Sequence, residues 1–177
     1  MDGCVFLVTG PSAAGKTTVA RLLANRFARG VHLEGDWFRR SIVSGRIDVT
    51  PDAPSEAVEQ LQLRYRLAAR VADAYWNEGF SVVLEDVVAG DDLPHLAGLV
   101  QSRPLHVVVL VPRLEVVAAR DTERESTGYR HWSLAGLYAI FATKTPRIGL
   151  WLDTSEQTPD QTVDSVLERT SPATPTT

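Results

Sequence analysis

The sequence has one cysteine, a small charge imbalance and no long apolar run, and each shortage excludes a class of protein. A single cysteine, Cys4, cannot form an internal disulfide, so nothing favours an oxidising compartment. A net charge of −4 gives no bulk attraction to nucleic acid or to anionic membranes. Neither a basic-then-apolar leader nor a run of membrane-spanning length is present. We therefore expect a soluble, cytoplasmic protein for which nucleic acid is an unlikely partner.

Short apolar runs alternate with segments of helical spacing along the whole chain. The apolar runs, typical of buried strands, occupy residues 4–9, 31–34, 80–88, 105–111 and 149–155. The helical segments occupy residues 16–29, 36–45, 55–78, 93–101, 113–126, 133–143 and 158–170. This alternation predicts an α/β fold in which helices cover both faces of a five-stranded parallel sheet. We expect one domain over residues 1–170 and a disordered tail over 171–177.

The loop after the first apolar run carries the clearest chemical signal. "GPSAAGKT" at residues 10–17 fits the phosphate-binding pattern G-x-x-x-x-G-K-[ST], with a strand before it and a helix after it. Backbone N–H groups and the helix N-terminus attract phosphate, Lys16 adds a full charge, and Thr17 offers a hydroxyl to Mg²⁺. We expect a P-loop NTPase fold that binds ATP and Mg²⁺. The predicted nucleotide-binding residues are Gly10, Pro11, Ser12, Ala13, Ala14, Gly15, Lys16, Thr17 and Thr18.

The rest of the sequence narrows the class of P-loop protein. It contains no N-K-x-D motif, which weighs against a GTPase of the Ras type. Its length does not accommodate an AAA-type ATPase with a helical subdomain. A small kinase is the class that remains.

"DWFRR" follows the second predicted strand directly and indicates an acceptor site. The carboxyl ends of strands line the ligand crevice in this fold, so Asp36 is expected opposite the phosphate loop. A carboxylate there can accept the proton of an acceptor hydroxyl, and Arg39 or Arg40 can hold the acceptor. Trp37 is a candidate for the pocket wall. In the alternative interpretation, Asp36 only caps a helix, both arginines are solvated and Trp37 belongs to the core.

"LED" ends the third predicted strand with two acids. A carboxylate at this place can support Mg²⁺ through water. Because side chains alternate along a strand, Glu85 and Asp86 point to opposite faces and only one can reach the metal directly. The sequence does not decide between them; we favour Asp86, which lies nearer the crevice, as the metal-supporting and substrate-side residue. Ordinary loop acids are the alternative.

Residues 113–132 form a basic segment that we interpret as a lid over the phosphates. Arg120 and Arg124 lie four residues apart on one helix face, where they can neutralise charge in the transition state. We therefore predict that both are catalytic, together with Lys16 and Asp36. A solvated helix with local acidic partners is the alternative, and Arg113 is expected to be structural.

Taken in order, "GPSAAGKTT", "GDWFRR", "VVLEDVV", the arginine segment and "LWLDTSEQTP" resemble the small P-loop kinases. Within them, the chain is most similar to the chloramphenicol phosphotransferase-like branch, with shikimate, gluconate and adenylyl-sulfate kinases as more distant relatives. The resemblance implies ATP- and Mg²⁺-dependent transfer to a small-molecule hydroxyl, with Asp36 as the base. The arginine-rich segment 36–54 departs from a chloramphenicol pocket, so another natural product, a sugar or a nucleoside is an equally open acceptor.

Two other functions remain open at this point. The D-x-x-R pair of Asp36 and Arg39 would also suit a polynucleotide or nucleotide kinase. A nucleotide-binding regulatory module without an acceptor is the alternative from another class, but it would have no need of a carboxylate at Asp36.

Overall fold

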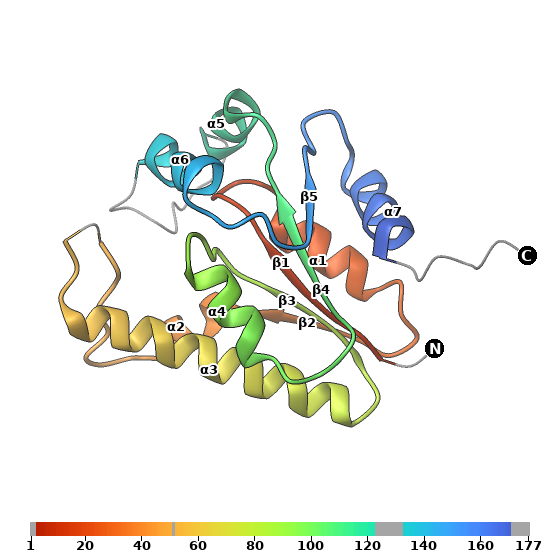
Figure 1. Cartoon of the computed structure of the whole chain (residues 1–177), viewed down its shortest axis with the longest axis horizontal. Helices are drawn as coiled ribbons and strands as arrows, with labels where there is room; N and C mark the ends of the chain where they lie inside the picture. Colours follow the sequence, from red (N-terminus) through yellow and green to blue (C-terminus); the bar gives the residue numbers. More distant parts are fainter. Residues whose placement is uncertain (1–2, 51, 123–132, 171–177) are drawn as a thin grey trace, which may run out of the picture.

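The computed structural model describes residues 3–50, 52–122 and 133–170. Its centre is a five-stranded, all-parallel sheet with the strand order β2-β3-β1-β4-β5 (Figure 1). The strands are β1 (Val5–Thr9), β2 (Gly30–Glu34), β3 (Ser81–Glu85), β4 (Leu105–Leu110) and β5 (Leu150–Leu152). All five predicted strands and their parallel arrangement are therefore confirmed.

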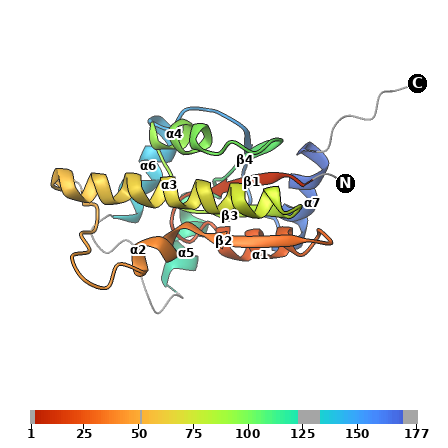
Figure 2. The same cartoon turned by 90° about the horizontal axis from the view of Figure 1, so that it is seen from below.

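Helices lie between successive strands along the chain. In the described residues they are α1 (Lys16–Ala24), α2 (Gly35–Arg40), α3 (Ser55–Asn77), α4 (Asp92–Leu99), α5 (Leu114–Thr122), α6 (Leu134–Thr143) and α7 (Pro159–Thr170). Figure 2 shows α4 and α1 on opposite sides of the sheet. This part of the chain has no helix that is both long and apolar enough to cross a membrane.

Two hydrophobic cores hold the helices against the sheet. On one face, Leu7 and Leu84 pack with residues of α3, α4 and α6, among them Tyr65 and Phe141. On the other face, Val8 packs with residues of α1 and α7. Because β1 and β3 are buried along their whole length, both faces of these strands are apolar, as the sequence predicts. Adjacent residues of one strand therefore point to opposite faces of the sheet and contact different helices. The same alternation determines which helix each acidic residue at the end of β3 faces.

One prediction for the helices is wrong. Glu34, and not Asp36, is the residue that precedes α2, and its side chain makes no capping hydrogen bond. Asp36 therefore lies inside the first turn of α2, where the partial positive charge of the helix N-terminus stabilises its carboxylate. On α3, the apolar side chains of Val58 and Tyr75 are 46% and 42% exposed. The helix is longer than the sheet that it covers, so its apolar stripe does not meet the core at every turn (Figure 1).

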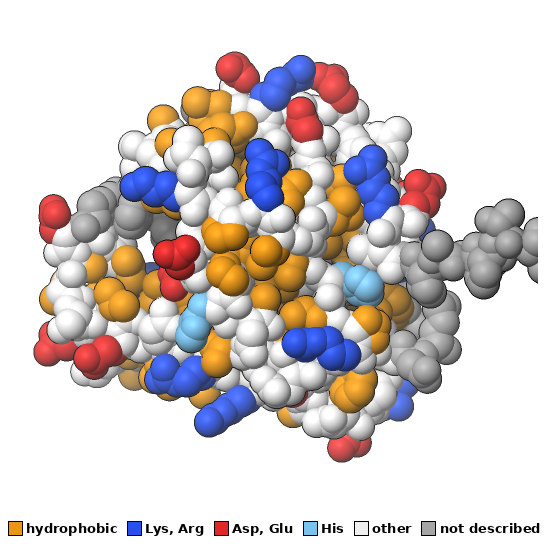
Figure 3. All heavy atoms as spheres, in the orientation of Figure 1, with side chains coloured by type: hydrophobic (Ala, Val, Ile, Leu, Met, Phe, Trp, Pro, Cys, Tyr) orange, Lys and Arg blue, Asp and Glu red, His pale blue; other side chains and the backbone are white. Residues whose placement is uncertain are grey.

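Charged side chains of both signs are interspersed over the face that Figure 3 shows. This mixture agrees with the small net charge of −4. On that face the protein offers no single-sign surface to a polyanion.

Candidate active site

The phosphate loop joins β1 to α1 and has the backbone conformation that phosphate binding requires. Ala13 and Gly15 have positive φ angles of 58° and 88°. Such left-handed residues turn successive N–H groups toward one point, which makes an anion-binding concavity at the start of α1. Gly15 adopts this conformation without the penalty that a Cβ would add. Ala13 has no such freedom, and strain of this kind is common at functional sites.

Lys16 and Thr17, the first residues of α1, point into the loop and toward β3. Lys16 Nζ donates to the carbonyl oxygen of Pro11 at 2.8 Å, so its charge already lies across the loop. The Thr17 hydroxyl donates to Glu85 Oε1 at 2.9 Å. The hydroxyl predicted to bind Mg²⁺ is therefore in contact with a carboxylate at the end of β3.

The carboxylate beside Thr17 belongs to Glu85, whereas Asp86 points to the other face of the sheet. Glu85 lies on the α1 side, and Asp86 lies on the α3 side, where Arg64 binds it. This is the divergence that strand alternation predicts. Our preference for Asp86 as the metal-supporting residue therefore disagrees with the structure, which brings Glu85 to the P-loop instead.

Asp86 forms a buried ion pair with Arg64 of α3. Arg64 Nε donates to Asp86 Oδ2 at 2.7 Å, and Arg64 Nη2 donates to Oδ1. The backbone N–H of Val87 donates to Oδ1 at 2.7 Å. Burial raises the pKa of Asp86, while Arg64 and the Val87 N–H oppose the rise. Gly35 makes room for this pair, because a Cβ there would lie 2.2 Å from Asp86 Oδ2.

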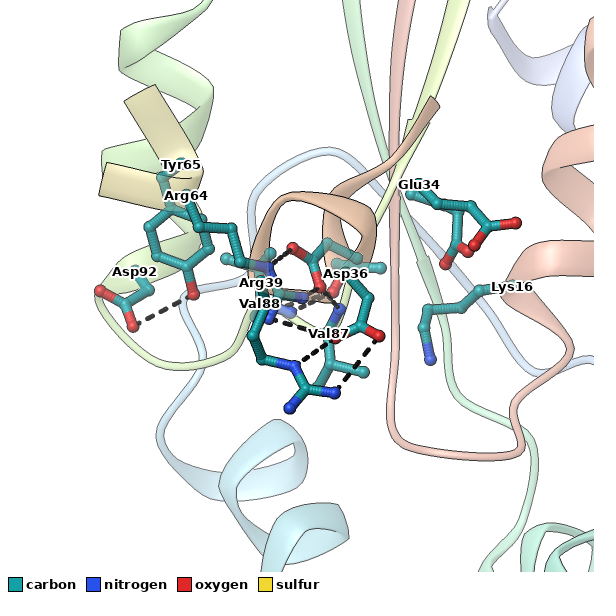
Figure 4. A network of polar contacts seen from close by, with 12 residues as sticks. Lys16, Glu34, Asp36, Arg39, Arg64, Tyr65, Val87, Val88 and Asp92 are labelled. Carbon is teal, nitrogen blue, oxygen red and sulfur yellow. Dashed lines mark hydrogen bonds and ion pairs between the residues drawn. The ribbon is translucent and has the colours of Figure 1, made fainter. Parts of the chain in front are cut away.

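Asp36 lies where β2 gives way to α2, between Arg39 and Arg64 (Figure 4). Arg39 Nε donates to Asp36 Oδ1 at 2.7 Å, and Arg39 Nη1 donates to Asp48 Oδ1 at 2.7 Å. Arg64 Nη1 lies 3.6 Å from Asp36 Oδ1, so Arg64 links Asp36 to Asp86. The structure thus links three carboxylates, Asp36, Asp48 and Asp86, through Arg39 and Arg64.

The surroundings of Asp36 favour its ionised form. Partial burial acts to raise the pKa of Asp36, but the hydrogen bond from Arg39 and the charges of Arg64, Arg39 and Arg40 outweigh it. The pKa of Asp36 is therefore lowered from the ordinary value of 3.8. The same contacts raise the pKa of Arg39. At neutral pH the carboxylate is charged and accepts hydrogen bonds only.

Glu34, Glu85 and His32 place three ligand atoms within 4.8 Å of one another beside Thr17. Burial raises the pKa of Glu85, and the charge of Lys16 and the Thr17 hydroxyl oppose the rise. Burial likewise lowers the pKa of His32, which favours the neutral imidazole. Glu34 and Glu85 offer the carboxylate oxygens that Mg²⁺ prefers, and the Thr17 hydroxyl lies 2.9 Å from Glu85, so these groups fit this ion, whereas the His32 nitrogen is a softer donor.

The remaining predicted residues have mixed outcomes. Trp37 is 57% exposed, so it is not a core residue. Arg40 is more exposed than Arg39 and pairs with Glu34 Oε2 at 3.0 Å. Arg120 lies in the last turn of α5, which follows the carboxyl end of β4. Arg124 and half of the predicted lid fall in residues 123–132, outside the described residues.

The late "DTS" segment is docked against the loop that follows β4. The backbone N–H of Arg113 donates to Ser155 Oγ at 2.7 Å, and the Arg113 guanidinium contacts Glu156. These contacts join the start of α5 to the segment after β5, and a structural role for Arg113 stays a prediction. The hydrogen bonds from Ser155 lower the pKa of Asp153.

Sequence reasoning missed Glu34, Asp48 and Arg64. For Glu34, the available signal was its place two residues before Asp36, at the end of β2. For Arg64, the signal was a basic residue three and four positions from Leu61 and Ala68, on the apolar stripe of α3. An arginine on a buried face needs an acidic partner.

The parallel sheet, the P-loop and the acidic groups at its carboxyl edge define a P-loop nucleotide-binding domain. The family model described as an AAA domain (AAA_33) matches residues 5–161, from the start of β1 into α7. The chain belongs to this family. The chain is too short for an AAA-type ATPase with an added helical subdomain, and the family match covers only the P-loop domain, so the two statements agree. No curated protein matches the chain.

Solved structures of small P-loop kinases share the fold over nearly the whole chain. A sugar kinase from Janibacter sp. HTCC2649 has a TM-score of 0.68 at 22% identity and covers 94% of this chain and 93% of its own. The Deinococcus radiodurans tunicamycin resistance protein has a TM-score of 0.66 at 16% identity, covering 96% of both chains. Mycobacterium tuberculosis APS kinase, solved with AMPPNP and APS, has a TM-score of 0.64 at 20% identity, covering 94% of this chain and 96% of its own. The predicted fold and the resemblance to small P-loop kinases are confirmed.

Proposed function

We propose that this protein is an ATP- and Mg²⁺-dependent phosphotransferase that moves the γ-phosphate to a hydroxyl group of a small molecule. The observation that carries the proposal is the place of Asp36. A P-loop alone would serve any nucleotide-binding protein, but a charged carboxylate held by Arg39 and Arg64 at the same edge of the sheet serves an acceptor. The kinase folds of the structural neighbours support this interpretation.

The phosphate loop holds the nucleotide in this proposal. Residues 10–18 wrap the phosphates, and Lys16 exchanges the Pro11 carbonyl for the β- and γ-phosphate oxygens. Thr17 and Glu85 hold Mg²⁺, with Glu34 beside them, in place of the Asp86 of the sequence-based prediction. When bound, the ion neutralises charge on the phosphates.

Asp36 orients the acceptor hydroxyl and accepts its proton. Because the pKa of Asp36 is lowered, its carboxylate is a weak base and a permanent hydrogen-bond acceptor. This suits phosphoryl transfer, whose loose transition state needs the hydroxyl aligned more than it needs early deprotonation. Positioning is thus the larger part of the contribution of Asp36.

The predicted lid contributes cations. Arg120 and Arg124 meet the charge of the transferring phosphoryl group in this proposal. Trp37, Arg39 and Arg40 line the acceptor side. The fold of the tunicamycin resistance protein supports an antibiotic or another natural product as the acceptor. Dependence on ATP agrees with a cytoplasmic location.

A nucleotide or polynucleotide kinase is the second candidate, supported by the D-x-x-R pair of Asp36 and Arg39. The test supplies radiolabelled [γ-³²P]ATP together with a small-molecule extract, with nucleoside monophosphates, or with 5′-hydroxyl oligonucleotides. We expect label in the small-molecule pool only, and none with Lys16→Ala. ATP binding without transfer to any pool would instead identify a binding module, and labelled nucleotide would favour the second candidate.

A further inference from the structure

We propose that the acceptor is an uncharged hydroxyl compound, such as a sugar, a nucleoside or a neutral natural product. It is not an anion such as a phosphate ester, a sulfate ester or a carboxylic acid. This inference rests on the proposed function and deepens it. It follows from the ion pairs around Asp36, in which the arginines of the acceptor side already have carboxylate partners. An anionic acceptor needs a guanidinium group that can leave its partner at low cost.

Arg39 is the arginine nearest to Asp36, and its donors are divided between two carboxylates. Nε and Nη2 donate to Asp36 at 2.7 and 3.4 Å, and Nη1 donates to Asp48 at 2.7 Å. An anion at Arg39 would have to use the N–H groups that these two carboxylates leave over. It would then lie close to Asp36 and Asp48, whose negative charges repel it.

Arg64 is even more firmly committed. Its side chain is 6% exposed and that of Asp86 is 2% exposed. Asp86 accepts two hydrogen bonds from Arg64 and one from Val87, an arrangement that favours the ionised carboxylate. Moving Arg64 to an acceptor would leave Asp86 buried and unpaired, which is among the most costly changes inside a protein.

The two outer arginines also have acidic partners. Arg40 pairs with Glu34 at 3.0 Å, and Arg46 lies 3.8 Å from Asp48. These pairs are exposed and therefore weak. However, an anion that replaced Glu34 or Asp48 in them would remain close to that carboxylate.

In the described part of the acceptor side, four guanidinium groups thus face four carboxylates. The cations are Arg39, Arg40, Arg46 and Arg64, and the acids are Glu34, Asp36, Asp48 and Asp86. A balanced set of this kind offers hydrogen bonds to hydroxyl groups but no net attraction to an anion. Trp37, exposed next to Asp36, adds the flat apolar surface that a sugar ring or an aromatic natural product packs against.

The test titrates inorganic sulfate into the protein loaded with AMPPNP and Mg²⁺ and follows the Nε–H signals of Arg39 and Arg64 by NMR. AMPPNP fills the phosphate loop, including the γ position, so sulfate has to bind elsewhere. We expect no saturable shift of either signal in the wild type. Saturable shifts in the wild-type protein would show that these arginines bind anions and would overturn the proposal.

Asp48→Ala is the matched variant, because it removes one partner of Arg39 and leaves Asp36 in place. It should bind sulfate at Arg39 at least about tenfold more tightly than the wild type, the contribution of a single charge-assisted hydrogen bond. Equal sulfate affinity in both proteins would show that pairing does not control anion binding, which also contradicts the proposal.

A transfer assay separates this inference from the proposed function. It compares neutral compounds with their anionic counterparts: glucose with gluconate, and nucleosides with nucleoside monophosphates. Transfer to the anionic members overturns the inference while confirming a kinase, and transfer confined to neutral members supports both. If ATP is bound and no compound is phosphorylated, the proposed function fails, and the sulfate titration still decides whether these arginines exclude anions.

Discussion

Replacing Asp86 with alanine should destabilise the fold strongly, because it leaves the Arg64 guanidinium buried without its principal partner. Removing one member of a buried ion pair typically costs 3–5 kcal/mol. Asp36 lies 3.6 Å from Arg64 Nη1 and partly compensates, so we expect about 3 kcal/mol, the lower end of that range. For a chain of this length, each kcal/mol lowers the melting temperature by about 2–4 °C. The variant should therefore melt about 6–12 °C below the wild type.

The assay is thermal unfolding followed by circular dichroism and calorimetry at neutral pH. A double variant, Asp86→Ala with Arg64→Met, is the control, because it removes the unpaired charge and keeps an apolar side chain on α3. We expect it to recover at least half of the lost melting temperature. A single variant that melts within about 2 °C of the wild type, a surface-like effect, would refute the assignment of Asp86 to a buried pair.

Three further predictions concern the nucleotide and acceptor sides. Glu85→Gln should keep the contact with Thr17, raise the melting temperature and weaken Mg²⁺-dependent turnover. Because the folded-state pKa of Glu85 is raised, the wild type loses stability as pH rises through that pKa, so the stability gained by the variant should grow with pH. A variant that is less stable than the wild type at neutral pH would contradict this prediction. Asp36→Asn should lower stability in full above the ordinary pKa of 3.8 and progressively less below it, since a lowered folded-state pKa adds stability that disappears as pH falls through it; a difference that persists in strong acid would be evidence against the ion pairs. Arg120→Ala should reduce kcat more than it weakens nucleotide binding, by about 10²-fold if it meets transition-state charge, and an unchanged kcat would make α5 a solvated surface.

The sequence predicts the sheet and the phosphate loop well because both depend on local pattern. β1 is a short apolar run, and residues 10–17 contain their own turn and charge chemistry. In contrast, local pattern does not predict the face of the sheet to which each residue at the end of β3 points. β3 is buried on both sides, so its sequence has no polar alternation that would assign Glu85 to α1 and Asp86 to α3.

The acceptor side could be predicted only in part, because its contacts join distant segments. Asp36 and Arg39 are one helical turn apart and were identified together. Asp48 comes from a loop and Arg64 from α3, and no spacing in the sequence links either of them to Asp36. The capping prediction failed for a local reason, since α2 begins at Gly35, one residue before Asp36.

The central claim is that Asp36 serves an acceptor while the phosphate loop holds ATP, and Asp36→Asn tests it most directly. The measurement supplies [γ-³²P]ATP and the small-molecule pool to wild type and variant, and ATP affinity is determined in parallel by calorimetry. We predict unchanged ATP affinity and a loss of label transfer to small molecules of at least about 10²-fold. Undiminished transfer by a variant that binds ATP normally would contradict the account.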